Sequence, residues 1–305
     1  MRAVLVIGAS GFVGKYLVKG LLAEGYTVRC LARDPARVQD LAALGCEVVK
    51  GDVSDLASVQ RAMKSVEAVY VSIHTLSPQP GSTPGQRFMA VEMDGLRNVV
   101  AACQAQGVRR LISVTSLGIT ADAPSEWLRE RWRAEQFLLG SGLDVTFVRP
   151  GMIVGVGGRG FGMMAGQARK SVAAGLGGRQ KMRSIAVDDL IYYLVTMLDD
   201  PRTYGQCYDV GNDDVLTNSE MVDATAEILG HRPPLKLKIP PALLGAFAPA
   251  IERAGKLPKG AMRGLLDSLE ADGSGDPKPI RALMPRPLLS FRQAVEQALT
   301  NNEKS

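Results

Sequence analysis

Residues 3–14 read AVLVIGASGFVG, and this stretch decides the fold class. Its first half is an unbroken run of apolar and β-branched residues, which predicts a buried β-strand. Gly8, Gly11 and Gly14 follow at three-residue spacing, directly before the helix-like segment FVGKYLVKGLLAEG. In this setting the glycines allow a tight turn and let backbone N–H groups at the helix start meet a pyrophosphate. The stretch therefore predicts a dinucleotide-binding unit, to which Ser10, Phe12 and Val13 also contribute. A turn that serves packing alone is the less favoured alternative.

The second strand candidate indicates which dinucleotide binds. It ends in LARDPAR, where NAD-binding folds place a carboxylate on the ribose. Arg33 in this motif would instead accept a 2'-phosphate, and Arg37 follows one helical turn later. We therefore expect NADP(H) in preference to NAD(H). Binding of NAD(H) stays open as the alternative, in which Asp34 binds the ribose and Arg33 faces solvent. Asp52 and Val53, after the third strand candidate, are expected beside the adenine.

The rest of the chain repeats this strand and helix alternation. Six strand candidates and five intervening helices up to about residue 150 predict an α/β fold with a doubly wound parallel sheet. The glycine-dense segment 151–181 predicts loops rather than regular elements. We expect a nucleotide-binding core at 1–210, with 151–181 as its substrate-side segment, and a smaller C-terminal substrate-side portion at 211–305. Within that portion, Thr217 with Glu220 and Ser290 with Gln293 have the spacing of helix capping boxes.

Composition excludes several classes of protein. The formal charge of +5 is spread over 36 basic and 31 acidic residues without a long block of one sign, so we expect no nucleic-acid partner. Four scattered cysteines and two histidines predict no metal site and a reducing compartment. No apolar run is long enough to span a bilayer, and the chain enters a strand at its third residue, so we expect a cytoplasmic protein.

The motifs IGASGFVG, LARDPAR, GDVSD, VYVSIHTL, SVTSLG, SGLDVTFVRPG and SIAVDDL together resemble the atypical and extended short-chain dehydrogenase/reductases. Within that superfamily the chain is most similar to NmrA-like proteins and to the Rossmann accessory subunits of respiratory complex I. The resemblance implies a Rossmann fold that binds NAD(P). It also implies that Ile73 and His74 line the nicotinamide side, that Ser116 borders the substrate, and that Pro150 turns the chain into the substrate-side region.

One feature of that superfamily is missing here. Its reductases and epimerases carry a Y-x-x-x-K pair, followed four residues later by a glutamate. Registering on Glu135 puts Arg131 at the lysine position and Trp127 at the tyrosine position. No other register restores the pair, because no tyrosine lies between residues 70 and 192 and no lysine between residues 64 and 170. The usual proton donor, a phenol whose pKa is lowered by a nearby ammonium, is therefore absent.

Three hypotheses remain for the function. The first is an NAD(P)H-dependent oxidoreductase whose small apolar acceptor, such as a quinone, a flavin or an activated double bond, needs little proton assistance. Ser116, His74 or water would supply the proton, although a structural histidine at a strand end is the somewhat favoured interpretation of His74. Arg131 could bind the ribose or stabilise an oxyanion, but it does not release a proton at neutral pH. The second is a non-catalytic NADP(H) sensor or assembly scaffold, and the third, ranked last, is a nucleotide-sugar epimerase or dehydratase.

The C-terminal third of the sequence bears on further binding partners. Residues 234–266 mix apolar faces with lysines and arginines, which could rest on an anionic membrane. A subdomain packed on the sheet with its lysines in water is the favoured interpretation, and a homo-oligomer is left open. The apolar residues of 151–181, namely Met152, Phe161, Met163 and Met164, fit a substrate pocket and a core equally well.

Overall fold

The computed structural model describes residues 2–73, 88–175, 180–238, 241–254 and 273–303. The chain forms two compact units, each assembled from three segments. The first unit comprises Met1–Thr115, Glu130–Val148 and Ile191–Tyr208, and the second comprises Ser116–Arg129, Arg149–Leu190 and Asp209–Ser305. The segment 151–181 therefore groups by its contacts with the C-terminal residues, and the predicted division at residue 210 stays a prediction.

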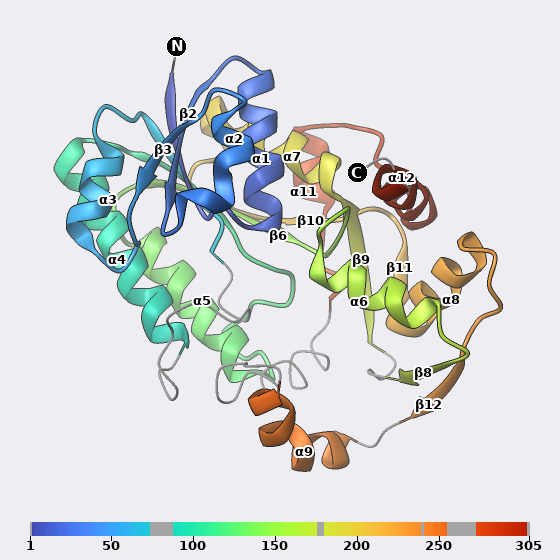
Figure 1. Ribbon diagram of the computed structural model, residues 1–305. Helices are drawn as coiled ribbons and strands as arrows, with labels where there is room; N and C mark the ends of the chain where they lie inside the picture. Colours follow the sequence, from blue (N-terminus) through green and yellow to red (C-terminus); the bar gives the residue numbers. More distant parts are fainter. Residues whose placement is uncertain (1, 74–87, 176–179, 239–240, 255–272, 304–305) are drawn as a thin grey trace. The chain divides into compact units, whose positions relative to one another are not determined.

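The first unit is built on a seven-stranded sheet in the order β10-β6-β5-β4-β1-β2-β3. Its strands β2, β3, β6 and β10 are labelled in Figure 1. Its strands are β1 (Ala3–Ile7), β2 (Thr27–Ala32), β3 (Glu47–Lys50), β4 (Ala68–Val71), β5 (Arg110–Val114), β6 (Asp144–Pro150) and β10 (Gln206–Val210). All pairs from β3 to β6 are parallel. Strand order reverses at β1, whose neighbours are β2 and β4, so the predicted doubly wound Rossmann fold is confirmed.

Helices cover both faces of this sheet. They are α1 (Phe12–Ala23), α2 (Gln39–Ala42), α3 (Leu56–Met63), α4 (Phe88–Gln106), α5 (Glu126–Leu139) and α7 (Val187–Thr196), with short 3-10 helices at Pro35–Val38, Met197–Asp199 and Pro201–Thr203. Val69 and Val71 of β4 pack into one core with residues of α3, α4 and α5. Tyr70, between them, points the other way, and its hydroxyl donates to the Leu194 carbonyl of α7 at 2.7 Å. Each central strand is therefore buried on both sides, as the apolar runs predicted.

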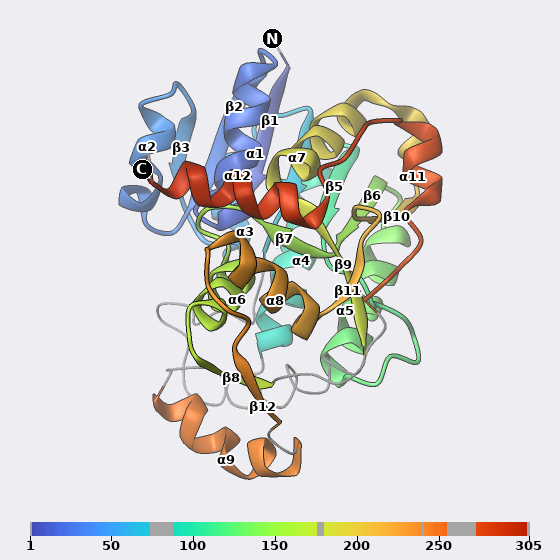
Figure 2. The same ribbon diagram turned by 90° about the vertical axis from the view of Figure 1, so that its right-hand side faces the viewer.

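The second unit contains two small sheets and several helices (Figure 2). One sheet has the order β11-β9-β7, and the other pairs β12 with β8. The elements are β7 (Met152–Val154), α6 (Arg159–Ala168), β8 (Val172–Gly175), β9 (Lys181–Ala186), β11 (Val215–Thr217), α8 (Asn218–Ile228), β12 (Leu235–Lys238), α9 (Pro241–Ala254), α11 (Lys278–Leu283) and α12 (Phe291–Glu303). Both predicted capping boxes form, because each N-terminal hydroxyl and the side chain three residues later bond reciprocally to backbone N–H groups.

The expectation of loops in 151–181 is wrong. This segment contains β7, α6 and β8. Helix α6 forms because Phe161, Met164, Ala165 and Ala168 follow helical spacing and are all buried in the core of the second unit. A Cβ on Gly162 or Gly166 would face open space, and a Cβ on Gly160 would only reach van der Waals contact with Met152 at 4.0 Å, so these glycines lower helix propensity without being required by the packing. Phe161 and Met164 are therefore core residues and Met152 packs against them, whereas Met163 is exposed.

Candidate functional site

The glycine-rich loop after β1 is a cradle that only glycine can form. Gly8 has a φ of +99°, and a Cβ there would lie 2.2 Å from the Ser72 carbonyl oxygen. A Cβ on Gly14 would lie 2.1 Å from the Gly8 carbonyl oxygen. The Gly11 N–H donates to the same oxygen at 2.9 Å and closes the turn. The loop thus holds the start of α1 tightly against the carboxyl ends of β1 and β4.

The start of α1 fits a phosphate group. Gly11 is the N-cap residue of α1, and among the described residues no side chain caps this end and no acidic residue lies in its first turn. Backbone N–H groups and the positive end of the helix dipole are therefore available to an anion. Ser10, Phe12 and Val13 are half-buried around the loop, and Phe12 packs edge-on against Tyr16. The predicted pyrophosphate fits this site.

The carboxyl ends of β2 and β3 add charged side chains. Arg33 follows β2, Asp52 follows β3, and the Arg33 Nε lies 4.0 Å from an Asp52 oxygen, with both side chains about 40% exposed. Asp34 caps the next 3-10 helix by accepting from the Ala36 N–H at 3.1 Å, which leaves it less suited to bind a ribose. Arg37 is exposed in the last turn of that helix. Two exposed arginines thus lie within one short segment after β2.

Val53 and Asp52 are held in place by the surrounding elements. The Val53 side chain packs against Gly95 of α4, where a Cβ would come within 2.9 Å of it, and the Asn98 amide donates to the Val53 carbonyl at 2.9 Å. Asp52 accepts from the Ser54 hydroxyl at 2.8 Å and from its N–H at 2.9 Å. These contacts fix the loop at which the adenine is expected.

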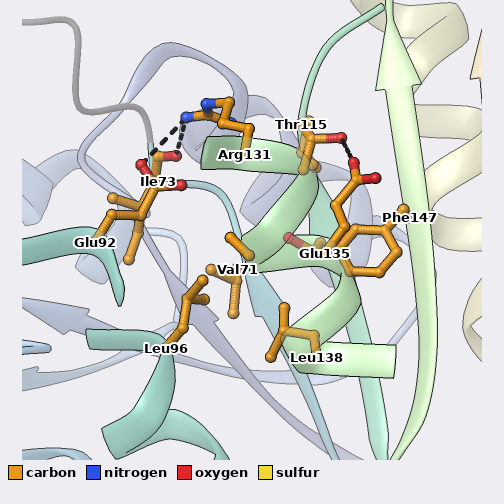
Figure 3. A pocket seen from close by; sticks show the side chains of 12 residues that line it. Val71, Ile73, Glu92, Leu96, Thr115, Arg131, Glu135, Leu138 and Phe147 are labelled. Carbon is orange, nitrogen blue, oxygen red and sulfur yellow. Dashed lines mark hydrogen bonds and ion pairs between the residues drawn. The ribbon is translucent and has the colours of Figure 1, made fainter. Parts of the chain in front are cut away.

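Arg131 forms a buried ion pair at the carboxyl end of β4. Its Nη2 lies 3.3 Å from Oε2 of Glu92 on α4 and 3.5 Å from the Ile73 carbonyl oxygen (Figure 3). The two side chains are 3% and 8% exposed. Such a pair is costly to break, because the remaining charge would stay buried without this counter-charge. Arg131 thus lies beside Ile73, on the side predicted for the nicotinamide.

Glu135 lies one helical turn beyond Arg131 on α5 and turns toward β5. Its Oε1 accepts from the Thr115 hydroxyl at 2.9 Å, and its side chain is buried (Figure 3). The two pairs line one cavity of about 10 Å³, together with Val71, Ile73, Leu96, Ser113, Val114, Ala134, Leu138 and Phe147. This volume holds about one water molecule. The cavity is therefore too small for a substrate, and the residues that line it support the site.

Three of the other predicted residues lie in the second unit. Trp127, at the position where the superfamily has its tyrosine, is buried. The Ser116 hydroxyl oxygen is buried without a hydrogen-bond partner in the described part of the chain. Pro150 is buried, and its carbonyl accepts from the Leu117 N–H at 3.1 Å. His74 lies outside the described residues. Among the described residues no cluster of side chains could hold a metal ion.

Sequence reasoning missed Glu92 and Thr115. A signal for Glu92 was present, because it shares a helical stripe with the buried residues Leu96 and Val99. A carboxylate within such a stripe requires a cationic partner. No comparable signal marks Thr115, whose partner Glu135 lies 20 residues away.

Comparison with known proteins shows the family of this chain. A family model described as NAD(P)H-binding matches residues 8–201, which include the glycine-rich loop, both arginines after β2 and α5. The chain belongs to this NAD(P)H-binding family. Family membership and the fit of the loop confirm the predicted cofactor as NAD(P)H, whereas the preference for NADP(H) stays a proposal.

Proteins with similar sequences include two reductases. The chain is 28% identical over 263 residues to a (4-alkanoyl-5-oxo-2,5-dihydrofuran-3-yl)methyl phosphate reductase of Streptomyces griseus, covering 82% of this chain and 86% of the relative. It is 30% identical over 251 residues to the ceramide reductase of Caulobacter vibrioides, covering 80% and 76%. Among solved structures, an NADPH-dependent quinone oxidoreductase of Escherichia coli complexed with NADPH has a TM-score of 0.76 at 22% identity, covering 97% and 99%. The last likeness shows the shared fold.

Proposed function

We propose that this protein is an NADPH-dependent oxidoreductase that reduces a small apolar acceptor, such as a quinone, a flavin or an activated double bond. The observation that carries the proposal is a glycine-rich loop that fits a pyrophosphate, combined with a helix α5 that has no tyrosine and no lysine. The reductase names of two relatives, and the quinone oxidoreductase of the same fold, support this class of reaction.

The residues of the first unit would bind and orient the cofactor. Backbone N–H groups in the first turn of α1 would hold the pyrophosphate, and Arg33 and Arg37 would pair with the 2'-phosphate. Asp52 and Val53 would border the adenine. Glu92 would hold Arg131 beside Ile73, where the fixed charge of the guanidinium could contact the ribose or stabilise an oxyanion.

The reaction of the acceptor then needs little acid catalysis. When bound, NADPH supplies a hydride from its nicotinamide ring. A quinone that accepts a hydride becomes a phenolate, which is a weak base and can take its proton from water. Ser116 would border the acceptor, and its hydroxyl, which has no hydrogen-bond partner in the described part of the chain, could donate to it. A ketone would become a far more basic alkoxide, which needs the missing phenol.

Turnover with a panel of acceptors tests this proposal. We expect NADPH consumption with small quinones, none with unactivated aliphatic ketones, and a rate that varies little between about pH 6 and pH 9, because no catalytic phenol titrates. Arg131→Met should raise the Michaelis constant for NADPH. Ketone reduction with a bell-shaped pH profile would contradict the proposal.

The absence of tyrosine and lysine from α5 also supports a second candidate, a non-catalytic sensor of the cofactor's redox state, because the usual proton donor is missing. A sensor should bind NADPH and NADP+ with clearly different affinities and consume no NADPH with any acceptor. Calorimetric titration with both forms, next to the turnover assay, separates the two candidates.

A further inference from the structure

A two-stranded ribbon in the second unit exposes a row of large aliphatic side chains. Strands β8 and β12 are parallel, and Leu235 pairs with Val172 while Leu237 pairs with Ala174. Paired residues of parallel strands, and alternate residues along each strand, share one face. On this face Val172 is 50%, Leu235 71% and Leu237 59% exposed. Aliphatic side chains rarely gather in water without a partner surface.

The opposite face of the ribbon is occupied by the second unit itself. Ala173, which lies on that face, is buried, and the Lys236 ammonium is paired with Asp223 of α8. The pairing fixes which face of the ribbon turns inward. The apolar face with Leu235 and Leu237 therefore points away from the core of this unit and does not contribute to its packing.

Basic residues gather where both strands begin. Arg169 and Lys170 precede β8, His231 and Arg232 precede β12, and all four are exposed. The Leu235 N–H donates to the Ser171 carbonyl at 2.9 Å, which brings the two strand starts side by side. Residues 168–175 and 229–238 contain no aspartate or glutamate. In the described part of the chain no ion pair involves Arg169, Lys170 or Arg232, so positive charge borders one end of the apolar face.

The helix that follows the ribbon has the same character. Helix α9 comes directly after β12 along the chain (Figures 1 and 2). Its exposed residues include Ala246, Phe247, Pro249 and Ala250, with Phe247 58% exposed, and Arg253 is exposed in the last turn. No helix among the described residues is long and apolar enough to cross a bilayer. The apolar surface of this region suits adsorption at an interface.

We propose that the apolar face of the β8–β12 ribbon, with its basic border and helix α9, docks this protein on a membrane that contains anionic lipids. Leucine and phenylalanine side chains would enter the boundary between headgroups and acyl chains, while the arginines and lysine pair with lipid phosphates. A protein partner for the same face would not require the positive charge at its edge. The proposal does not depend on the proposed reaction, because it uses no residue of the cofactor site.

Sedimentation of the full chain with lipid vesicles tests this surface. We expect binding to phosphatidylcholine vesicles that contain phosphatidylglycerol, much weaker binding to pure phosphatidylcholine, and release by salt. The pair Leu235→Ser and Leu237→Ser should lower the partition coefficient by about tenfold or more. The triple variant Arg169→Ala, Lys170→Ala and Arg232→Ala should lower it by about a hundredfold on anionic vesicles.

Matched controls come from the first unit. Leu44 is 55% exposed there, so Leu44→Ser should leave vesicle binding unchanged, as should Lys19→Ala with Lys64→Ala. Circular dichroism should show the same unfolding temperature for all variants, because every substituted side chain is exposed or partly exposed. Three results would overturn the proposal: no binding of the wild type to anionic vesicles, equal loss with the control variants, or a dimer that the leucine variants dissociate without any vesicle binding.

Discussion

At Gly8 the backbone geometry requires the glycine that the sequence motif contains. Its positive φ and the 2.2 Å approach of the Ser72 carbonyl would strain any side chain at this position. We expect Gly8→Ala to lower the free energy of unfolding by about 2 kcal/mol or more and to abolish NADPH binding. Urea unfolding and calorimetry measure both effects. Gly162→Ala, in open space on α6, is the matched control and should stabilise the protein slightly.

Glu92 and Arg131 can be tested as a pair. Glu92→Gln removes this counter-charge from the buried guanidinium and should cost about 3 kcal/mol of stability. Arg131→Met removes the counter-charge from the buried carboxylate and should cost about the same. The double variant should be more stable than the sum of the two losses predicts. Unfolding of all four proteins measures this coupling. Purely additive effects would show that the pair does not form in solution.

At the scale of elements, Arg110 joins β5 to β6 and to the turns after α7. Its buried guanidinium donates to the carbonyls of Asp144, Met197 and Leu198 and to the hydroxyls of Thr146 and Thr203, at 2.7 to 3.0 Å. It also lies 4.5 Å from the centre of the Tyr204 ring. One side chain therefore satisfies acceptors from three segments of the first unit, namely β6 and the 3-10 helices Met197–Asp199 and Pro201–Thr203.

Substitution of Arg110 should loosen this edge of the sheet. Arg110→Ala leaves several buried acceptors unpaired and should cost about 3 kcal/mol or more. The neighbouring residue is the control, because Arg109 is exposed and makes only a surface ion pair with Asp144, so Arg109→Ala should leave stability nearly unchanged. Thermal unfolding compares the two. Equal losses would mean that the network around Arg110 contributes little.

At the scale of the whole molecule, the four cysteines report on folding. Burial raises the pKa of the Cys103 thiol to about 12, and the pKa values of Cys30 and Cys46 are also raised by burial, whereas Cys207 is exposed. A native sample should therefore react quickly with a thiol reagent at Cys207 alone, and Cys207→Ser should remove the fast phase. Rapid reaction of Cys103 at neutral pH would contradict the buried core.

The same thiols predict how stability varies in alkaline solution. Their folded pKa values lie above the ordinary value of 9.0, so the unfolded chain releases its protons first as pH rises. The stabilising contribution is complete below about pH 9 and is lost between about pH 9 and pH 12. Urea unfolding at several pH values should show this decline, and replacing Cys103 by alanine should reduce it.

Much of the fold could be predicted because local sequence patterns determine its strands and helix starts. The loop at Gly8 to Gly14 and the β-branched runs determine the sheet, and both capping boxes form where their spacing predicted. The helix in 151–181 could not be predicted from glycine content, because the buried stripe of Phe161 and Ala165 outweighs the poor helix propensity of its glycines. The partner of Arg131 lies 39 residues away, so tertiary packing and not local sequence defines that part of the site.

We propose that the glycine-rich loop binds NADPH and that Arg33 recognises its 2'-phosphate. Calorimetric titration of the wild type and of Arg33→Asp with NADPH and NADH tests it most directly. We expect the wild type to prefer NADPH, and the variant to lose about a hundredfold in affinity for NADPH while NADH binding changes little. Equal affinities of the wild type for the two cofactors, or equal losses of both in the variant, would contradict the claim.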